Sequence, residues 1–431
     1  MYDNIIKIYE LEHIRNEIQS IESTYNDKNL FLHITLKRDN YNCPYCYNEE
    51  IKINDYVKKK ITHTISITKS VYIIFRHRRF KCSFCNKTFF EKNPFISTNK
   101  NISTLTVMNI LQYLKDPNHT FSSAASYHNV SVNSVIDIFD KHVDPKRKTM
   151  PNVLCIDEVH IKSKTKYPYA CVLLDFETGK IVDVLRTRRK KYLRDYFDKI
   201  PYKELKNIQY VVMDLWSPYK DVMNEFVPHA KIIADAFHVV TNINRILDKK
   251  RIQVMNKYRM MDQTNLYYHN DFGYLLKIFS WMILRNQRKI KAQYYYIKRY
   301  RMNVYKKDLL NHLLSSDDEL REIYNLRNVY VEFNEYASID EAKEKLLELS
   351  KEFMNHHISE IREYGRTLYR WKNEIINSFY KVNGERYSNS KIESRNRQIK
   401  TILRNSFGYK NFWRFRARVM YSINKDVPLK L

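Results

Sequence analysis

Proline is distributed very unevenly along this chain of 431 residues. Nine of the ten prolines lie between Pro44 and Pro228, the tenth is Pro428, and none stands between His229 and Val427. A long stretch without proline suits helices, because proline removes a backbone donor and clashes with the preceding turn. Glycine is also scarce, with 5 residues, so neither a dinucleotide-binding fingerprint nor a P-loop can be built. We therefore expect a mixed first half followed by a long helical region.

The chain is strongly basic, with 75 Lys and Arg against 48 Asp and Glu and a formal net charge of +27. Such an excess attracts polyanions, and nucleic acid is the expected partner. The first eighteen residues are charged throughout, so we expect no signal peptide. The longest apolar run, Leu275 to Leu284, spans only ten residues, whereas a bilayer crossing needs ~20. We expect a soluble, intracellular protein whose thiols are reduced.

Four cysteines form two CxxC pairs separated by 35 residues: Cys43, Cys46, Cys82 and Cys85. Each pair can supply two thiolates to one tetrahedral ion, so the four together predict a structural zinc site. A redox motif, the alternative, needs only one such pair. Strand-like segments between the pairs fit a zinc ribbon with an extended hairpin. The basic run Arg76–Arg79 beside it is expected near phosphates or on a solvated edge strand. Cys155 and Cys171 lie inside predicted strands, as core residues.

Residues 121–139 predict a helix, a tight turn and a second helix. Asn129 can adopt the left-handed conformation of the turn, and Ser131 is suited to cap the second helix. The side chains of that helix expected to face inward are Val132, Val135, Ile136 and Phe139. Asn133 and Ser134 would then lie at the start of a DNA-recognition helix. An ordinary pair of packed helices without any role in DNA binding is the alternative.

Two aspartates stand at the ends of apolar segments in a region, 152–235, where predicted strands and helices alternate. Asp157 ends the strand Val153–Asp157, and Asp214 ends the strand Tyr210–Asp214. A carboxylate at the end of a buried strand needs a cation or donors. Two adjacent strand ends would bring both acids to one rim of a sheet, as in sites that hold two divalent ions ~3.5–4 Å apart. Two ordinary capping aspartates are the alternative.

A third carboxylate is offered by the predicted helix 390–404. Its packing side carries Ile392, Ile399 and Leu403. A second side carries one acid followed by a row of cations: Glu393, Arg397, Lys400 and Arg404. An acid leading a basic row fits a metal ligand beside phosphate contacts. From spacing alone, a surface helix with i,i+4 charge pairs is the better explanation.

Taken together, these motifs resemble the transposases of the ISL-three (ISL3) insertion-sequence family, which belong to the DDE superfamily with a ribonuclease H-like fold. The likeness covers nearly the whole chain in the family's order. Its segments are 156–160, 169–185, 212–219, 234–239, 390–404, 408–412 and Arg416. By this resemblance, Asp157, Asp214 and Glu393 match the three acidic positions, and Asp235 and His238 match a supporting Asp-x-x-His pair. The family often has glycine after the glutamate, where this chain has the small Ser394.

The resemblance implies an α/β fold: a ribonuclease H-like catalytic core with a long all-helical insertion, preceded by a zinc ribbon and a helix-turn-helix domain. The implied domains are the zinc ribbon (1–98), the helix-turn-helix domain (99–148), the first part of the core (149–240), the helical insertion (241–385), and the catalytic helix with the C-terminus (386–431).

The activity implied by the resemblance is that of a DNA transposase, which binds terminal inverted repeats, cuts the 3′ ends and joins them to target DNA. Asp157, Asp214 and Glu393 would hold two Mg2+ ions, one activating water or the 3′-hydroxyl and the other stabilising the leaving oxygen. One structural Zn2+ would be held by the four cysteines. The residues expected to contact double-stranded DNA are Asn133, Ser134, Arg397, Lys400 and Arg404.

The implied assembly is a homodimer on DNA, in the bacterial cytoplasm at the nucleoid and without a membrane partner. A DNA-binding regulator with an idle catalytic domain is the main alternative, and the presence of all three acids disfavours it. A ribonuclease H-like nuclease that cuts without strand transfer is a further alternative. The zinc and helix-turn-helix motifs weigh against that second possibility.

Overall fold

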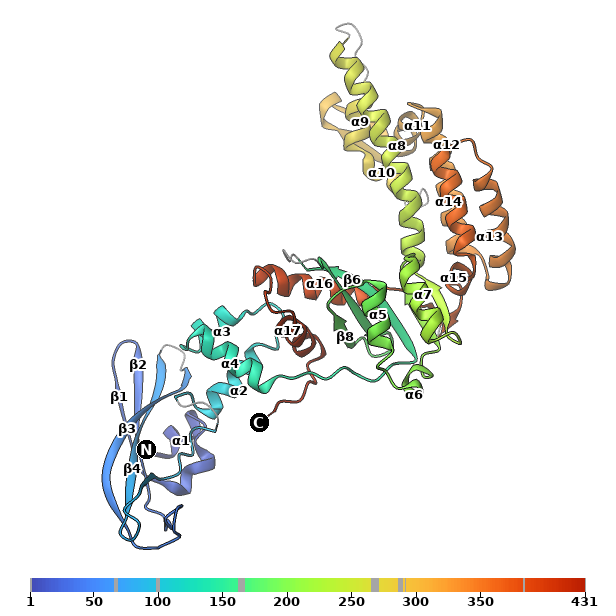
Figure 1. Cartoon of the computed structure of the whole chain (residues 1–431). Coiled ribbons are helices and arrows are strands. Elements are labelled where there is room, and N and C mark those ends of the chain that lie inside the picture. The colour runs from blue at the N-terminus through green and yellow to red at the C-terminus, as the bar shows by residue number, and fades with distance from the viewer. Residues whose placement is uncertain are drawn as a thin grey trace. The chain divides into compact units, whose positions relative to one another are not determined.

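The computed structural model describes residues 2–65, 69–97, 101–161, 167–264, 271–285, 290, 292–382 and 384–430. The chain forms two compact units, each built from more than one stretch of sequence (Figure 1). The first unit comprises Met1–Arg147, His160–Pro168 and Arg397–Leu431, and the second comprises Lys148–Val159 and Tyr169–Asn396. Among helices in the described ranges, none is long and apolar enough to cross a membrane.

The N-terminal part of the first unit is a five-stranded sheet in the order β1–β2–β4–β3, with β5 paired to β4. Its strands are β1 (Ile18–Tyr25), β2 (Asn29–Leu36), β3 (Ile51–Ile65), β4 (Ser70–Cys82) and β5 (Thr88–Phe90). β3 and β4 form the long antiparallel hairpin expected between the two CxxC pairs. Alternate apolar residues of β4, Val71, Ile73 and Phe75, are buried in one cluster with Ile6 of α1 (Tyr2–Ile8).

The basic run Arg76–Arg79 does not lie on an edge strand, so that expectation was wrong. β4 has strand neighbours on both sides. Arg78 is buried and donates to the equally buried Glu91 over 2.8 Å, while Arg79 is paired with Asp55. A buried guanidinium is tolerated here because its charge is paired and its donors are bonded. Only Arg76 of the run is exposed, so a phosphate contact stays a prediction for that residue alone.

Four helices form the rest of the first unit's core: α2 (Thr104–Tyr113), α3 (Phe121–Tyr127), α4 (Val132–His142) and α17 (Phe412–Asn424). As expected, Asn129 has a positive φ of 51°, and the Ser131 side chain accepts from the backbone N–H of Ser134 at the start of α4. Tyr421 of α17 is fully buried in the same cluster as the helix pair.

The inward face of α4 differs from the expected one. Val132 is 39% exposed and Ile136 is half-buried, whereas Ile138 is buried between Val135 and Phe139. The buried face of α4 is rotated from the expected one because α4 packs against α17 as well as α3. The rings of Phe139 and Tyr421 lie 5.8 Å apart, edge to face. The sequence of the helix pair alone carries no sign of this distant partner.

The second unit contains a five-stranded sheet in the order β10–β9–β6–β7–β8. Its strands are β6 (Val153–His160), β7 (Tyr169–Asp175), β8 (Ile181–Leu185), β9 (Tyr210–Met213) and β10 (Lys231–Ala234). β6, β9 and β10 run parallel, and β7 and β8 form an antiparallel hairpin. The hairpin turns at Gly179, whose φ of 66° suits glycine, and the N–H of Gly179 donates to the Asp175 carbonyl. The connecting helices are α5 (Lys190–Phe197), α6 (Tyr202–Leu205) and α7 (Ser217–Phe226).

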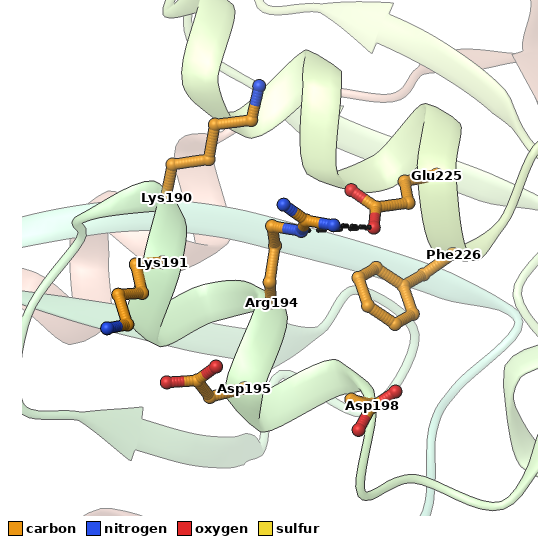
Figure 2. A pocket seen from close by; sticks show the side chains of 7 residues that line it. All are labelled: Lys190, Lys191, Arg194, Asp195, Asp198, Glu225 and Phe226. Atoms are coloured by element: carbon orange, nitrogen blue, oxygen red, sulfur yellow. Dashed lines mark hydrogen bonds and ion pairs between the residues drawn. The ribbon is translucent and has the colours of Figure 1, made fainter.

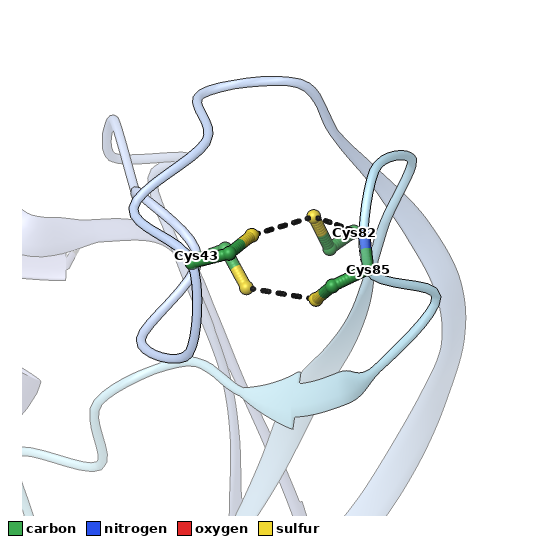
Figure 3. A group of neighbouring side chains, drawn as sticks. Cys43, Cys82 and Cys85 are labelled. Atoms are coloured by element: carbon green, nitrogen blue, oxygen red, sulfur yellow. Dashed lines mark hydrogen bonds between the residues drawn. The ribbon is translucent and has the colours of Figure 1, made fainter.

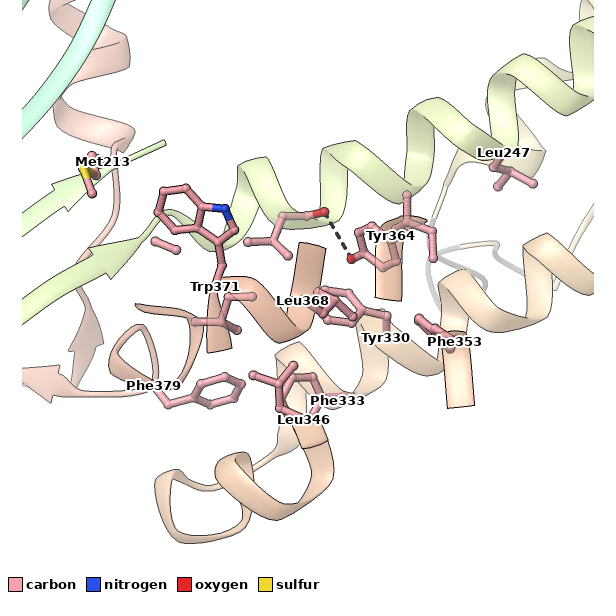
Figure 4. Packing of buried hydrophobic residues seen from close by; sticks show 14 of the residues in the cluster. Met213, Leu247, Tyr330, Phe333, Leu346, Phe353, Tyr364, Leu368, Trp371 and Phe379 are labelled. Atoms are coloured by element: carbon pink, nitrogen blue, oxygen red, sulfur yellow. Dashed lines mark hydrogen bonds between the residues drawn. The ribbon is translucent and has the colours of Figure 1, made fainter. Parts of the chain in front are cut away.

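A long helical region follows the sheet. Its helices are α8 (Ala236–Thr264), α9 (Phe272–Ile278), α10 (Ser280–Leu284), α11 (Lys306–Leu314), α12 (Asp318–Tyr336), α13 (Ile339–Met354), α14 (Ser359–Arg370) and α15 (Lys372–Asn377). Figure 1 shows α12 and α14 alongside α8, with α13 beyond α14. Tyr330, Phe333, Phe353 and Tyr364 are packed between these helices, and the Tyr364 hydroxyl donates to the Val239 carbonyl over 3.3 Å (Figure 4).

The expectation of an all-helical insertion was wrong. β11 (Tyr294–Ile297) and β12 (Met302–Tyr305) form an antiparallel hairpin within it. Absence of proline permits helix but does not require it, and three consecutive tyrosines favour a strand. A second short antiparallel pair of strands, β13 (Lys381–Val382) and β14 (Glu385–Arg386), precedes α16 (Ser390–Asn405).

Candidate active site

Three aspartates lie at one level of three neighbouring parallel strands, one within β6 and two directly after β9 and β10. β6 continues to His160, so the expectation that this strand ends at Asp157 was wrong. Ile156 of β6 and Ala234 of β10 both pair in register with Met213 of β9. The next residue on each strand is an aspartate: Asp157, Asp214 and Asp235. The three residues before each aspartate are apolar and buried, so the three carboxylates fall at the same level of the sheet. The sheet therefore gathers three carboxylates that are separated in the sequence.

His238 lies among these acids, at the start of α8. Its Nε2 is 3.2 Å from Oδ1 of Asp214, 3.7 Å from Oδ2 of Asp235 and 3.8 Å from Oε1 of Glu393. Glu393 comes from the first turn of α16. All five residues predicted at this site, Asp157, Asp214, Asp235, His238 and Glu393, thus belong to one acidic cluster in the second unit.

Two asparagines that flank Glu393 contact the cluster and were not predicted. Asn389 directly precedes α16, and its Nδ2 donates to Oδ1 of Asp214 over 3.0 Å. Asn396 lies within α16, and its Nδ2 donates to Oδ2 of Asp157 over 2.7 Å. Both asparagines are buried, with exposed fractions of 0% and 4%. The available signal was their spacing from Glu393, which places all three residues on one face of a helix.

Burial and electrostatic repulsion raise the pKa values of the clustered aspartates. Burial, and then the neighbouring Asp214, raises the pKa of Asp157 from 3.8 to about 7. Burial, and then Asp235, raises the pKa of Asp214 to about 7, although the bond from Asn389 lowers it. Burial also raises the pKa of Asp235. Because the same oxygens are hard ligands close together, a divalent cation fits the donor set and would offset this repulsion. Ligand atoms of Asp214, Asp235 and His238 lie within 4.8 Å of one another.

Glu158 follows Asp157 directly but belongs to the other face of the sheet. It is paired with Arg188 and accepts from the Tyr219 hydroxyl over 3.3 Å. The Arg188 guanidinium stacks on Tyr169 and Trp216. Successive side chains of a strand point to opposite faces, and this alternation removes Glu158 from the acidic cluster.

The four predicted zinc ligands converge in the first unit. Sγ of Cys43 lies 3.5 Å from Sγ of Cys85, and Sγ of Cys46 lies 3.6 Å from Sγ of Cys82 (Figure 3). Tetrahedral zinc with Zn–S of ~2.3 Å places its sulfurs about 3.8 Å apart, so the cluster fits the ion. Although burial opposes it, backbone N–H groups of Tyr45 and Cys46 lower the pKa of Cys43 to about 7. A backbone N–H lowers the pKa of Cys46, but burial and the neighbouring sulfurs raise it to about 12, because the metal-free thiols share protons.

The two CxxC turns have the same backbone design. Tyr47 and Asn86, each directly after the second cysteine of a pair, have positive φ angles of 60° and 58°. In each turn the N–H of that residue donates to the carbonyl of the first cysteine, Cys43 or Cys82, over 2.9 and 3.1 Å. The two halves are therefore matching knuckles that present two sulfurs each. Cys155 and Cys171 are fully buried in strands, as expected.

The cationic row of α16 lines a cavity of about 490 Å3 in the first unit. The lining residues are His160, Arg397, Lys400, Thr401, Leu403 and Arg404. Arg397, Lys400 and Arg404 are exposed, whereas Ile392, Ile399 and Leu403 are buried, as the sequence indicated. At the other predicted DNA contact, Asn133 is exposed, while the Ser134 hydroxyl is 2.8 Å from that of Ser131, inside the helix cap.

A further cavity of about 580 Å3 lies between α5 and α7 (Figure 2). It is lined by Lys190, Lys191, Arg194, Asp195, Asp198, Glu225 and Phe226. Arg194 bonds to Glu225 over 2.7 Å, and Lys190 is paired with Asp221 over 2.8 Å. Its cations are thus largely matched by nearby acids, and none of the clustered carboxylates lines it.

Comparison with known proteins agrees with this geometry. The transposase of insertion sequence element IS1001 from Bordetella parapertussis is 22% identical to this chain over 245 residues, 56% of the chain. The match spans 54% of that protein, about half its length. The zinc-finger model of the IS204/IS1001/IS1096/IS1165 transposases matches residues 40–85, which contain all four cysteines. The DDE transposase model of the ISL3 family matches residues 154–419, more than half of the chain and the whole acidic cluster. The chain belongs to the ISL3 family of DDE transposases.

Proposed function

We propose that this chain is a metal-dependent DNA transposase that binds the terminal inverted repeats of its element, cuts their 3′ ends and joins them to target DNA. The observation that carries the proposal is the register of Asp157, Asp214 and Asp235 on three parallel strands, with Glu393 brought to the same cluster by α16. The five-strand order β10–β9–β6–β7–β8 supports a ribonuclease H-like core.

In this proposal Asp157, Asp214 and Glu393 bind two Mg2+ ions, and Asp235 and His238 support them. Bound divalent ions supply an activated oxygen nucleophile and stabilise the leaving oxygen of the scissile phosphate. The protein's own part is to hold the carboxylates close together on rigid strands and on α16. His238, in contact with three acids, keeps Asp214 and Asp235 oriented.

DNA recognition is assigned to the first unit. The zinc ribbon (1–98), held by one Zn2+ at the four cysteines, and the helix-turn-helix domain (99–148) would read the ends. Asn133, exposed at the start of α4, would contact a base edge, with Ser134 beside it. Arg397, Lys400 and Arg404 would bind phosphates through the cavity that they line.

The proposed division of the chain has two further parts. The ribonuclease H-like catalytic core would comprise 149–240 and 386–431. The insertion 241–385 would contact DNA or a second subunit in a homodimer.

The test is an end-cleavage assay with purified protein, Mg2+ and duplex DNA that carries the element's terminal repeats. We expect new 3′-hydroxyl ends with wild-type protein, and none with Asp214→Ala, which should still bind the ends. If wild-type protein bound the ends but left them intact with both Mg2+ and Mn2+, the chain would be a DNA-binding regulator instead.

A further inference from the structure

We propose that Asn389 and Asn396 are positioning residues that hold Asp214 and Asp157 so that each carboxylate keeps one fixed orientation toward the bound ion. The proposal rests on the proposed function, because it assigns these two aspartates as metal ligands. It concerns residues other than the three acids Asp157, Asp214 and Glu393. It also assigns α16 and its first turn a second role besides supplying Glu393.

The two asparagines and Glu393 lie on one stripe of this helical segment. The Asn389 carbonyl accepts the N–H of Glu393 over 2.9 Å, so Asn389 is already part of the first turn. The spacings from Asn389 are four and seven residues, and at roughly 100° per residue the three side chains fall within about 60° of one another. The helix therefore presents amide, acid and amide in succession to the strand ends. The outer amides reach Asp214 over 3.0 Å and Asp157 over 2.7 Å.

The orientation of each amide is determined by its bond to the acid. The flipped amide would place its own oxygen against a carboxylate oxygen, which is repulsive. Both amide oxygens, Oδ1 of Asn389 and of Asn396, are buried and have no hydrogen-bond partner within the described part of the chain. Buried polar atoms are usually bonded, so two amides that use only their donors, both on site acids, are unlike ordinary core asparagines.

The choice of residue also fits the task. Lysine or arginine in these positions would neutralise the carboxylates and compete with the ion. Asparagine donates a hydrogen bond without positive charge, so the acid keeps its negative charge for the metal. The side chain cannot ionise, and the bond holds the carboxylate while leaving a lone pair on it free for coordination.

The remaining contacts of the two aspartates differ. Oδ1 of Asp157 also accepts the N–H of Glu158 over 2.7 Å, and Oδ1 of Asp214 also faces Nε2 of His238 over 3.2 Å. In each aspartate, therefore, an asparagine bond supplements one other contact. Losing the amide would leave that contact and a freer rotation about the side chain. We expect metal affinity to fall more than folding stability.

The experiment is a Mn2+ titration of the full-length protein bound to end DNA, with free Mn2+ followed by electron paramagnetic resonance. The variants are Asn396→Leu and Asn389→Leu, which keep size and remove the donor. We expect each to weaken Mn2+ binding roughly 10–100-fold, the usual effect of losing a partner of a metal ligand. Cleavage should return toward the wild-type rate at saturating metal, because the ligands themselves are intact.

The matched control is Asn377→Leu. Its amide also donates within the second unit, to the Ile232 carbonyl over 2.8 Å, but it does not contact the acids. We expect it to lower thermal stability and leave Mn2+ affinity unchanged. If Leu is not tolerated at position 396, as judged by circular dichroism, Asn396→Ser is used. Serine accepts burial, and its hydroxyl is too short to reach Asp157.

The outcomes separate this inference from the proposed function. Wild-type Mn2+ affinity in both asparagine variants, together with loss of binding in Asp157→Ala, would overturn the inference alone. Wild-type affinity in Asp157→Ala would overturn the ligand assignment itself. Weakened affinity in the asparagine variants that no metal concentration rescues would also overturn the inference, since it would indicate a misfolded site.

Discussion

Asp157 and Asp214 stand next to each other on adjacent parallel strands, each one residue beyond the register pair Ile156 and Met213. Both are mostly buried, and the repulsion between them adds to the cost of burial in raising the pKa of Asp157 to about 7. A sheet rim built this way is costly unless a cation is shared there. The raised pKa values at the site and its need for a cation follow from this pair.

The first prediction concerns the three acids as a unit. Asp157→Ala, Asp214→Ala or Glu393→Ala should each lower the rates of cleavage and joining roughly a thousandfold or more. Each variant removes an oxygen ligand of a metal ion that stabilises the transition state by several kcal/mol. End binding, measured by gel shift, should persist or tighten, since loss of an acid near phosphate relieves repulsion.

The controls for the acids are Glu158→Gln and Asp175→Asn. Glu158 is bonded to Tyr219 on the other face of the sheet, and Asp175 accepts bonds from the turn residues Glu177 and Thr178. Both variants should cut DNA. Normal cleavage by Glu393→Ala would remove Glu393 from the site and make Asp235 the next candidate.

The second prediction concerns pH. The pKa of Asp157 and of Asp214 is about 7 in the folded protein, against ~3.9 in an unfolded chain. Between these values the folded state holds protons that the unfolded chain has released. Stability without magnesium should therefore fall as pH rises from ~4 to ~7, by at most ~1.4 kcal/mol per pH unit and group. Magnesium must displace the same protons, so its apparent affinity should rise from about pH 6 to about pH 8.

Thermal melts in magnesium-free buffer, with wild type and Asp157→Asn compared, measure this effect. The variant has no proton to lose at position 157, and it also relieves the repulsion on Asp214. Its stability should therefore depend less on pH in this window. Equal slopes for the two proteins would contradict the pKa shift.

Much of the fold follows from local sequence. The CxxC pairs, the apolar strand before Asp214 and the cap at Ser131 each depend on neighbours within a few residues, and the structure confirms them. The strand that contains Asp157 also forms, but it continues to His160. Local signals fail where the partner is distant in the sequence. Arg78 is basic but buried, because Glu91 lies opposite it after β5. Which face of α4 packs is set by Tyr421, nearly three hundred residues away.

The candidate site was predictable in its acids and not in its amides. A carboxylate at the end of an apolar strand is costly and therefore conspicuous. Asparagine is common at helix starts and on surfaces, so the spacing of Asn389 and Asn396 from Glu393 gains meaning only once the helix is placed against the sheet. The β11–β12 hairpin was missed for a related reason: neither proline nor glycine marks it, and only the run Tyr294–Ile297 favours a strand.

The third prediction concerns the cationic row. Arg397→Ala, Lys400→Ala and Arg404→Ala should each weaken binding to end DNA and to random DNA alike, and should reduce the salt slope of log K by about 1, because each phosphate contact releases counterions. Arg395→Ala is the control, since its guanidinium donates to the Gly179 carbonyl over 2.9 Å. Salt slopes equal to wild type in all three variants would exclude phosphate contacts by this row.

The fourth prediction concerns sequence recognition. Asn133→Ala should reduce the preference for end DNA over random DNA by ~1–3 kcal/mol, the usual worth of one good base contact. Ser134→Ala should cost less preference, because its hydroxyl faces Ser131 within the cap. Competition binding at ~150 mM salt, near physiological strength, measures both. A larger loss for Ser134→Ala than for Asn133→Ala would reverse the assignment.

The last prediction concerns zinc. Native mass spectrometry should find one zinc per chain, and none in Cys82→Ser, because the matching knuckles each contribute two sulfurs and neither can hold the ion alone. Binding free energies of such sites are ~10–16 kcal/mol, far above the stability of a small module, so loss of zinc should unfold the ribbon. Protease should then cut between the knuckles, within β3 and β4. Cys155→Ala is the matched control: it removes a buried strand cysteine outside the cluster and should retain zinc and an intact ribbon. Zinc-free wild-type protein that resists protease in this segment would show that the hairpin folds without the ion.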